Sequence, residues 1–231
     1  MADGLVRINK YLADRGIATR KDADALISRG LVTINGRRAV LGDKVSADDA
    51  VAVKGGVSRQ YRYIAYNKPF GVITHSPQYG EKDIAASSTL KGLFPVGRLD
   101  KRSSGLIILT NDARITERLL SPRFEHEKEY RVTTADPLPE HFRQRMERGV
   151  DIGGYVTKPC TIRITGAKSF SIVITEGKKH QIRRMCDAVK APAVGLERTR
   201  IMNIRLGDLA PNAYREVTGG ELARFLKALG L

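Results

Sequence analysis

The 231-residue sequence has no tryptophan and only two cysteines, Cys160 and Cys186. Two cysteines provide neither a disulfide framework nor a Cys-x-x-Cys metal motif, and they fit a reducing compartment, so we expect a cytoplasmic protein. The four histidines are scattered along the chain without the spacing of metal ligands. The sequence therefore predicts no metal site.

Long apolar runs and acidic residues are also scarce. No apolar run approaches the roughly 20 residues that cross a bilayer, and the first residues lack the apolar core of a signal peptide, so we expect no membrane partner. The 25 acidic residues are outnumbered by 40 basic ones, which gives a formal net charge of +15. Such an excess points to a polyanionic partner, because each Lys or Arg that neutralises a phosphate releases counterions.

With 42% hydrophobic residues, the chain can bury a core in one or two domains. The first part shows the pattern of two short helices followed by a small sheet, and Thr19 and Asp22 have the spacing of a helix-capping box. A Gly-Gly pair ending at Gly56 marks a short linker. The sequence therefore predicts one domain at residues 1–56 and a second at residues 57–231.

Basic side chains of the first domain cluster near the helix ends and the expected hairpin. There they could face a phosphate backbone without entering the core. A solvated basic surface explains such a cluster too, although its concentration near one helix and one turn favours RNA. The candidates are Arg15, Arg20, Lys21, Arg29 and Arg37.

The second domain shows the alternating strand and helix patterns of an α+β fold, with a mainly antiparallel mixed sheet flanked by helices. We expect helices after residues 111 and 180. Strands are expected near residues 63–67, 71–74, 106–110, 129–134, 160–164, 170–175 and 201–206.

One acidic side chain, Asp100, stands among the cations Arg98, Lys101 and Arg102, shortly before the apolar strand expected at residues 106–110. Nearby cations favour the ionised form of a carboxylate, which suits a base or a nucleophile rather than an acid. A charged surface turn explains the same pattern. The local pattern leaves both interpretations open.

Two further segments can be interpreted either as functional or as purely structural. Tyr130 lies on an expected strand and could offer its ring to a nucleic-acid base, although a tyrosine in a strand is commonly half-buried packing. Residues 176–185 carry several basic side chains into an expected helix, where they could bind phosphates or pair with a carboxylate. A solvated helix start explains this second pattern too.

Three runs of the first domain carry a resemblance to a known module: Arg7 to Leu12, Thr19-Arg20, and Ile27 to Gly36. They resemble the α-L RNA-binding module first known from a small-subunit ribosomal protein, over roughly residues 5–54. In that family the module binds structured RNA largely through shape and backbone. The resemblance implies that this module binds RNA and does not itself catalyse a reaction.

Four motifs follow in a fixed order, and together with the first domain they cover essentially the whole chain. They are Asn67 to Gly71, Pro95 to Asp100 with Ser103 to Asn111, Lys128 to Tyr130, and Glu176-Gly177 with Gln181 to Met185. In this order they resemble the RsuA/RluF family of ribosomal RNA pseudouridine synthases. The runs 157–160 and 196–203 are most similar to the RluF type, which modifies a large-subunit rRNA uridine. The resemblance leaves tRNA recognition open.

The resemblance implies roles for three residues. Asp100 would be the catalytic aspartate, which either adds to C1′ of the uridine or abstracts a C2′ proton to give a glycal. Tyr130 would stack on the flipped base and act in proton transfer, and Arg183 would pair with Asp100. Exchanging one glycosidic bond for another requires no cofactor. Contacts with RNA would come from Lys68, Arg98, Lys101, Arg102, Lys178, Lys179 and Arg184.

The implied partner is structured RNA, either an rRNA stem-loop or a tRNA anticodon stem-loop, and a monomer is the simplest expectation. A non-catalytic RNA-binding or ribosome-assembly factor with a structural Asp100 is an alternative, and so is a synthase acting on small-subunit rRNA. A hydrolytic nucleosidase is disfavoured because a lone carboxylate lacks the usual acid partner.

The chain departs from the family pattern at Arg102 and Ser104, where related sequences often carry acidic residues. This departure predicts tighter electrostatic engagement of RNA near Asp100. Residues 79–90 carry no functional prediction.

Overall fold

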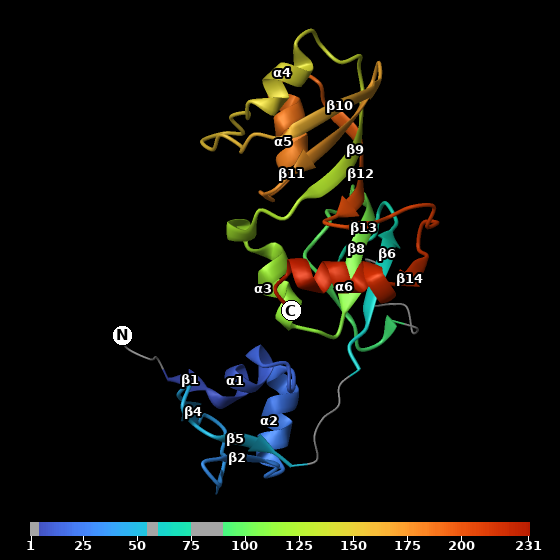
Figure 1. Ribbon diagram of the computed structural model, residues 1–231. Coiled ribbons are helices and arrows are strands. Elements are labelled where there is room, and N and C mark those ends of the chain that lie inside the picture. The colour runs from blue at the N-terminus through green and yellow to red at the C-terminus, as the bar shows by residue number, and fades with distance from the viewer. Residues whose placement is uncertain (1–4, 55–59, 75–89) are drawn as a thin grey trace. The chain divides into compact units, whose positions relative to one another are not determined.

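The computed structural model describes residues 5–54, 60–74 and 90–231 (Figure 1). The domain boundary expected between residues 56 and 57 lies outside the described residues, and so does most of the segment 79–90. Across the described ranges, no helix is both long and apolar enough to cross a bilayer.

The chain divides into two compact units, which are described separately. The N-terminal unit comprises Met1–Tyr61 with Asn111–Thr116, and the C-terminal unit comprises Arg62–Thr110 with Glu117–Leu231.

Residues 5–54 of the N-terminal unit form two helices and two small antiparallel sheets. Strand β2 lies between β3 and β5, while β1 pairs with β4. The expected capping box is confirmed, since the Thr19 hydroxyl accepts a 3.1 Å hydrogen bond from the amide of Asp22 at the start of the second helix. The elements are β1 (Val6–Arg7), α1 (Ile8–Asp14), α2 (Arg20–Ser28), β2 (Val32–Ile34), β3 (Arg37–Arg38), β4 (Lys44–Val45) and β5 (Val51–Val53).

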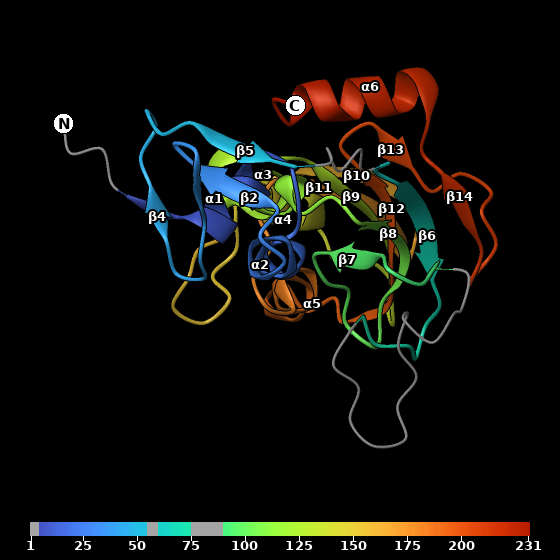
Figure 2. The same ribbon diagram turned by 90° about the horizontal axis from the view of Figure 1, so that it is seen from below.

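The C-terminal unit is built on one mixed sheet with the order β10-β11-β9-β12-β8-β6-β14, and most of this order can be followed across Figure 2. Strands β12 and β8 run parallel, and the other pairs of this sheet among the described residues are antiparallel. The strands are β6 (Tyr63–Lys68), β7 (Phe94–Val96), β8 (Ser104–Thr110), β9 (Lys128–Thr134), β10 (Thr161–Gly166), β11 (Ser169–Ile174), β12 (Ala193–Ile201), β13 (Ile204–Arg205) and β14 (Tyr214–Glu216).

Helices flank this sheet, as the sequence predicts. Helices α4 and α5 lie beside its β10–β11 end (Figure 1). Arg118 of α3 donates from Nη1 to the carbonyls of Leu229 and Gly230, at 2.7 Å each, and so joins α3 to the end of α6. The helices are α3 (Arg114–Leu120), the 3₁₀-helix η3 (Pro122–Phe124), α4 (Phe142–Glu147), α5 (Gln181–Ala188) and α6 (Gly219–Ala228).

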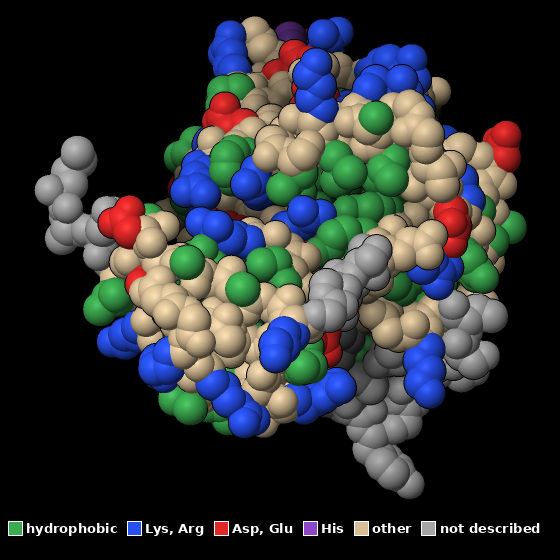
Figure 3. All heavy atoms as spheres, turned by 60° about the horizontal axis from the view of Figure 1, so that its bottom comes forward, with side chains coloured by type: hydrophobic (Ala, Val, Ile, Leu, Met, Phe, Trp, Pro, Cys, Tyr) green, Lys and Arg blue, Asp and Glu red, His purple; other side chains and the backbone are tan. Residues whose placement is uncertain are grey.

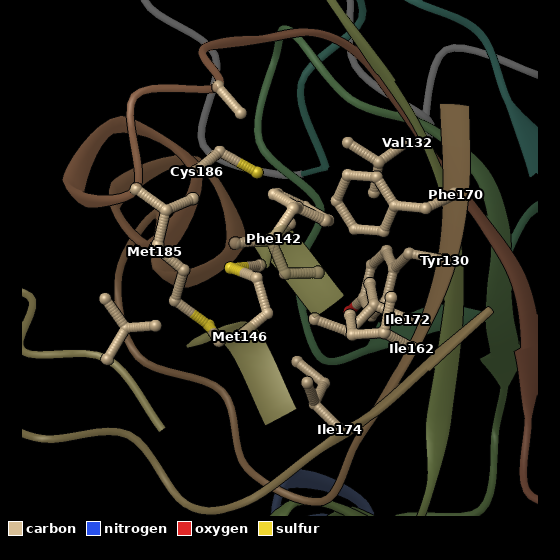
Figure 4. Close-up of a cluster of buried hydrophobic side chains, with 14 of the residues drawn as sticks. Tyr130, Val132, Phe142, Met146, Ile162, Phe170, Ile172, Ile174, Met185 and Cys186 are labelled. Atoms are coloured by element: carbon tan, nitrogen blue, oxygen red, sulfur yellow. The ribbon is translucent and has the colours of Figure 1, made fainter. Parts of the chain in front are cut away.

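The larger core cluster of the C-terminal unit lies between the sheet and the helices α4 and α5. Phe142 of α4 meets Phe170 of β11 edge to face, with ring centroids 4.8 Å apart. Tyr130 of β9 extends into the same cluster beside Ile172 (Figure 4). The face of α5 that carries Met185 closes the cluster, because its apolar residues recur at helical spacing. A well-packed core therefore supports the strand that carries Tyr130.

Two of the expected strands differ in the structure. Residues 71–74 do not form an extended strand: Gly71 completes a turn at a φ of +82°, and Ile73 forms only a single β-bridge. The strand expected at residues 201–206 is a hairpin, in which Met202, at a φ of +51°, reverses the chain between β12 and β13. The central strand β12 begins at Ala193, where the sequence prediction placed no strand.

Candidate active site

A cavity of about 700 Å³ opens within the C-terminal unit. Its wall is formed by the segment between β7 and β8, by β9 and β12, and by the segment between β11 and α5. The cavity brings together Asp100, Tyr130 and three of the predicted RNA-binding cations, which are Arg98, Lys178 and Lys179. Within the described part of the chain, no three His, Cys, Asp or Glu side chains are grouped to hold a metal ion.

The loop that carries Asp100, residues 97–103, is held in place through its backbone. The buried Thr74 hydroxyl accepts a 3.0 Å hydrogen bond from the Leu99 amide and donates one of 2.8 Å to the Leu99 carbonyl. The amide of Gly71 donates to the Lys101 carbonyl at 2.8 Å. These bonds fix the loop while the Asp100 side chain remains 44% exposed. A carboxylate held in this way can reach a ligand in the cavity.

The nearest charged partner of Asp100 is His180, which directly precedes α5. Its Nε2 lies 3.5 Å from Oδ1 of Asp100, so a protonated His180 forms an ion pair there. The expected pairing of Asp100 with Arg183 is wrong in this structure. Arg183 instead donates to the carbonyls of Ala193, at 2.6 Å, and Arg102, at 2.7 Å. These two bonds commit its guanidinium to bracing the Asp100 loop against α5.

Lys68 does not contact RNA in the way the sequence predicts, because its side chain is fully buried. Its Nζ donates to the carbonyls of Pro69, at 2.9 Å, and Val72, at 2.6 Å. Burial lowers the pKa of Lys68 to about 8, although the nearby Asp100 carboxylate acts to raise it, and the charge of Arg198 contributes to the lowering. Lys68 therefore stabilises the turn beside the Asp100 loop and adds positive charge behind the cavity.

Tyr130 and Arg198 face each other across β9 and β12. They are register partners, and the Arg198 side chain is buried although it lines the cavity. Its Nε donates to the Leu106 carbonyl at 2.7 Å, and its Nη1 lies 3.5 Å from the Tyr130 hydroxyl. On the other side of Arg198, Gly105 has a φ of +101°, and a Cβ there would lie 2.4 Å from the Arg198 carbonyl oxygen. Glycine is therefore required where β8 approaches β12.

The loop between β11 and α5 is organised by the buried carboxylate of Glu176. This carboxylate accepts hydrogen bonds from the Tyr155 hydroxyl at 2.5 Å, the Lys158 amide at 3.0 Å and Nε2 of Gln181 at 2.8 Å. Lys178 lies over the Tyr155 ring, with Nζ 4.3 Å from its centroid. The loop that presents Lys178, Lys179 and His180 to the cavity therefore has a defined conformation.

Sequence reasoning missed several residues of this site. Thr74 and Lys128 received no role, Arg198 was noted only within a family-like run, and His180 only as part of a basic turn. Burial lowers the pKa of Lys128 to about 8, with the charge of Arg198 adding to the effect. The sequence offered no signal for Arg198, because no strand was predicted at its position and its burial became evident only in the structure.

The predicted RNA-binding residues of the N-terminal unit lie on its surface. Arg37 forms an exposed ion pair with Asp43, and the Arg15 guanidinium lies 4.3 Å from the centroid of the Tyr11 ring. Figure 3 shows Lys and Arg side chains spread over the face in view, with fewer Asp and Glu. The remaining candidates comprise the exposed Arg20, Lys21, Arg29, Lys101 and Arg102, and the half-buried Arg184.

Comparison with known protein families identifies both parts of the chain. The family described as RNA pseudouridylate synthase matches residues 62–188, and the S4 domain matches residues 6–51. A sheet-based catalytic domain behind an RNA-binding S4 domain defines the class of RNA-modifying isomerases. The chain belongs to the RNA pseudouridylate synthase family, and the expected α-L module is its S4 domain.

Individual relatives agree with this assignment. The dual-specificity RNA pseudouridine synthase RluF of Escherichia coli (strain K12) is 39% identical over 236 residues, covering 99% of this chain and 81% of the relative. The ribosomal small subunit pseudouridine synthase A of Pasteurella multocida is 34% identical, covering 96% of this chain and all of the relative. A crystal structure of a pseudouridylate synthase aligns with a TM-score of 0.69 at 28% identity, covering 97% of this chain and 99% of that one.

Proposed function

We propose that this pseudouridine synthase isomerises a uridine of large-subunit ribosomal RNA, and that Asp100 acts on the sugar of a uridine flipped into the cavity. The observation that carries the proposal is the position of Asp100. Its half-exposed carboxylate lies at a cavity of about 700 Å³ whose wall contains the Tyr130 side chain. A carboxylate beside an aromatic side chain suits a reaction in which the sugar reacts while the base stays held.

The chemistry requires little beyond this carboxylate. Asp100 either adds to C1′ as the N1–C1′ bond breaks or removes a C2′ proton to leave a glycal. In both routes the electron pair of the N1–C1′ bond stays with the base, which turns so that C5 bonds to C1′. This step expels the Asp100 carboxylate from C1′ in the first route, whereas C2′ takes back a proton in the second. C5 then loses its proton and N1 gains one. His180, with Nε2 3.5 Å from Oδ1 of Asp100, would help to position the carboxylate. Tyr130 would stack on the base and hold it for reattachment.

Binding of the RNA would be shared between the two units. Extrusion of a base costs a few kcal/mol, which contacts of cations with the flanking phosphates can offset. The exposed cations of the S4 domain and the cations Arg98, Lys178 and Lys179 at the cavity are placed on surfaces that RNA can reach.

The target assignment rests on the similarity to RluF. That relative is named a dual-specificity enzyme, which supports testing a tRNA anticodon stem-loop beside the ribosomal RNA. A small-subunit target is the second candidate, because the Pasteurella multocida relative is named for the small ribosomal subunit.

The test uses RNA fragments that carry tritium at C5 of uridine, because formation of the C5–C1′ bond releases this tritium to water. Large-subunit rRNA, small-subunit rRNA and tRNA transcripts are incubated separately with wild type and Asp100→Asn. We expect release from a large-subunit fragment with wild type and none with Asp100→Asn. Release of tritium from small-subunit RNA alone would show that the target lies in the small subunit. Equal release by both proteins would show that the reaction does not need the Asp100 carboxylate. No release from any RNA would favour a non-catalytic RNA-binding factor.

A further inference from the structure

The wall of the cavity contains a buried guanidinium with one unused donor. Arg198 is 4% exposed, and its Nη2 has no hydrogen-bond partner, whereas Nε donates to the Leu106 carbonyl. Buried polar groups are nearly always paired, since an unpaired donor loses its water without a replacement. Arg198 also lines the cavity. Arg198 therefore combines a buried donor that has no partner with a place in the cavity wall, and a small adjustment of the side chain would let that donor pair with an acceptor on a ligand.

Among the residues that the structure describes, no carboxylate forms an ion pair with Arg198. The partners of its side chain are a backbone carbonyl and, at 3.5 Å, the Tyr130 hydroxyl, and neither carries a negative charge at neutral pH. The buried Lys68 and the half-buried Lys128 lie close enough for the charge of Arg198 to lower their pKa values, while the Asp100 carboxylate is the anion that acts on Lys68. This side of the cavity therefore carries an excess of positive charge in a poorly solvated place, where an electrostatic interaction is strong.

We infer that Arg198 donates from Nη2 to a carbonyl oxygen of the uracil and stabilises the negative charge that this oxygen gains during the reaction. The inference rests on the proposed function. When the N1–C1′ bond breaks, its electron pair stays on the base and spreads from N1 to the oxygens O2 and O4. The sugar is balanced either by its new bond to Asp100 or by loss of its C2′ proton. A fixed cation at one of these oxygens stabilises the detached base more than the intact nucleotide, and so accelerates bond cleavage.

A base oxygen fits this donor better than a phosphate does. Arg198 lies beside the Tyr130 hydroxyl, at the edge of the ring that would stack on the base. Phosphates stay on the solvated backbone of the RNA, and the exposed Arg98, Lys178 and Lys179 at the same cavity are available to them. Both O2 and O4 are carbonyl oxygens that gain negative charge, so either could accept the hydrogen bond from Nη2. The experiment therefore replaces one oxygen at a time.

The test is a double-substitution cycle between Arg198 and the base oxygens. The RNA that wild type modifies is prepared with uridine, 2-thiouridine or 4-thiouridine at the target position, and turnover is measured with wild type, Arg198→Lys and Arg198→Met. Sulfur is a weaker hydrogen-bond acceptor than oxygen. The ratio of kcat/KM for the oxo and thio substrates is taken within each protein, so it does not depend on how much of a variant is folded.

We expect Arg198→Met to lower kcat on uridine RNA by about 100-fold with little change in KM, as for other donors to a developing oxyanion. We also expect the oxo-to-thio ratio to fall by roughly 10-fold at one of the two positions, which identifies the oxygen bound by Nη2. Arg198→Lys keeps the charge but loses the fork of donors, so its effects should be intermediate.

Arg200→Met is the matched control. Arg200 lies on the same strand and is largely buried, but it pairs with Glu129 at 2.9 Å and Glu127 at 3.0 Å and does not line the cavity. Its removal tests the effect of deleting a buried arginine from β12, and its oxo-to-thio ratios should equal those of wild type.

Two results would overturn the role of Arg198. One is an equal loss on all three substrates in Arg198→Met, which leaves the oxo-to-thio ratios unchanged at both positions. The other is a loss seen only as weaker, less salt-dependent RNA binding, which would indicate a phosphate contact. Failure of the proposed function would differ from these, because wild type itself would then release no product from any RNA.

Discussion

The two units of this protein differ in where their lysine and arginine side chains lie, because those assigned to RNA binding in the S4 domain are exposed and those near the catalytic cavity include buried ones. The cations of the S4 domain that we assign to RNA are exposed, and one of them, Arg37, pairs with Asp43 at the surface. Behind the cavity of the C-terminal unit, Lys68 and Arg198 are buried and bonded mainly to backbone carbonyls. Exposed charges are screened by water and salt, whereas buried charges are screened much less and act strongly on nearby groups. The first kind suits RNA binding and the second suits catalysis.

The largest expected contrast is between two glycines that both have positive φ. Gly105→Ala would place a Cβ 2.4 Å from the Arg198 carbonyl oxygen, between β8 and β12, so we expect it to lower the free energy of unfolding by about 4 kcal/mol or more. Gly36→Ala in the S4 domain meets nothing within 4 Å and should cost only about 1 kcal/mol, from backbone strain. Chemical denaturation of both variants measures the difference. Equal losses would contradict the tight approach of β8 to β12.

The second contrast concerns the pH dependence of stability. Lys68 has a pKa of about 8 in the folded state against 10.5 when unperturbed, so the unfolded chain binds more protons between these two values. Its contribution to the free energy of unfolding should therefore rise with pH across this window, by up to about 3 kcal/mol. Denaturation of wild type and Lys68→Met at pH 7.5, 9 and 10 should show wild type gaining on the variant as pH rises.

Lys21→Met, a substitution of an exposed lysine, is the control for this experiment. A substitution at a solvated position should differ from wild type by no more than about 0.5 kcal/mol at each pH. A constant difference between wild type and Lys68→Met would show that Lys68 is solvated in the folded protein.

The third contrast is the salt dependence of RNA binding. Arg102 is exposed in the Asp100 loop and takes the place of a common acidic residue, so Arg102→Asp should weaken RNA binding and make the slope of log Kd against log salt shallower by about 1. Arg163→Asp makes the same charge change on the exposed surface of β10, at the far end of the sheet order, and should alter the slope less. An unchanged slope in Arg102→Asp would show that this loop does not contact the RNA backbone.

The smallest expected effect is at the surface ion pair of the S4 domain. Arg37 and Asp43 lie 2.9 Å apart, but the Arg37 side chain is 60% exposed. Arg37→Ala should lower the free energy of unfolding by less than about 0.5 kcal/mol, because water and salt screen such a pair, while RNA binding should weaken. Denaturation together with an RNA titration separates the two roles. A large loss of stability without a loss of RNA affinity would make Arg37 a structural residue.

Local patterns predicted much of the fold. The Thr19 capping box, the apolar strand that became β8 and the basic turn that leads into α5 each depend on neighbours in sequence, and each is present in the structure. The strand β12 was missed because Arg198 and its charged neighbours are atypical of a central strand. Its burial depends on acceptors that other strands supply, such as the Leu106 carbonyl of β8.

The site residues show the same division. The sequence singled out Asp100 and Tyr130, and the structure places both at one cavity, while their catalytic roles stay predictions. The pairing of Arg183 with Asp100 and the exposure of Lys68 could not be derived from spacing, because each depends on which carbonyl groups the folded chain brings near. His180 lies 80 positions from Asp100 in sequence and reaches it only through the fold.

The sequence by itself determined the class of partner and the order of the domains, because net charge, apolar periodicity and motif order are properties of the chain as written. Only the tertiary structure decided which cations meet solvent and which are buried. Burial depends on the packing of strands that are distant in sequence. The electrostatic interactions of an arginine are weakened by water at the surface, whereas those of a buried arginine are much stronger.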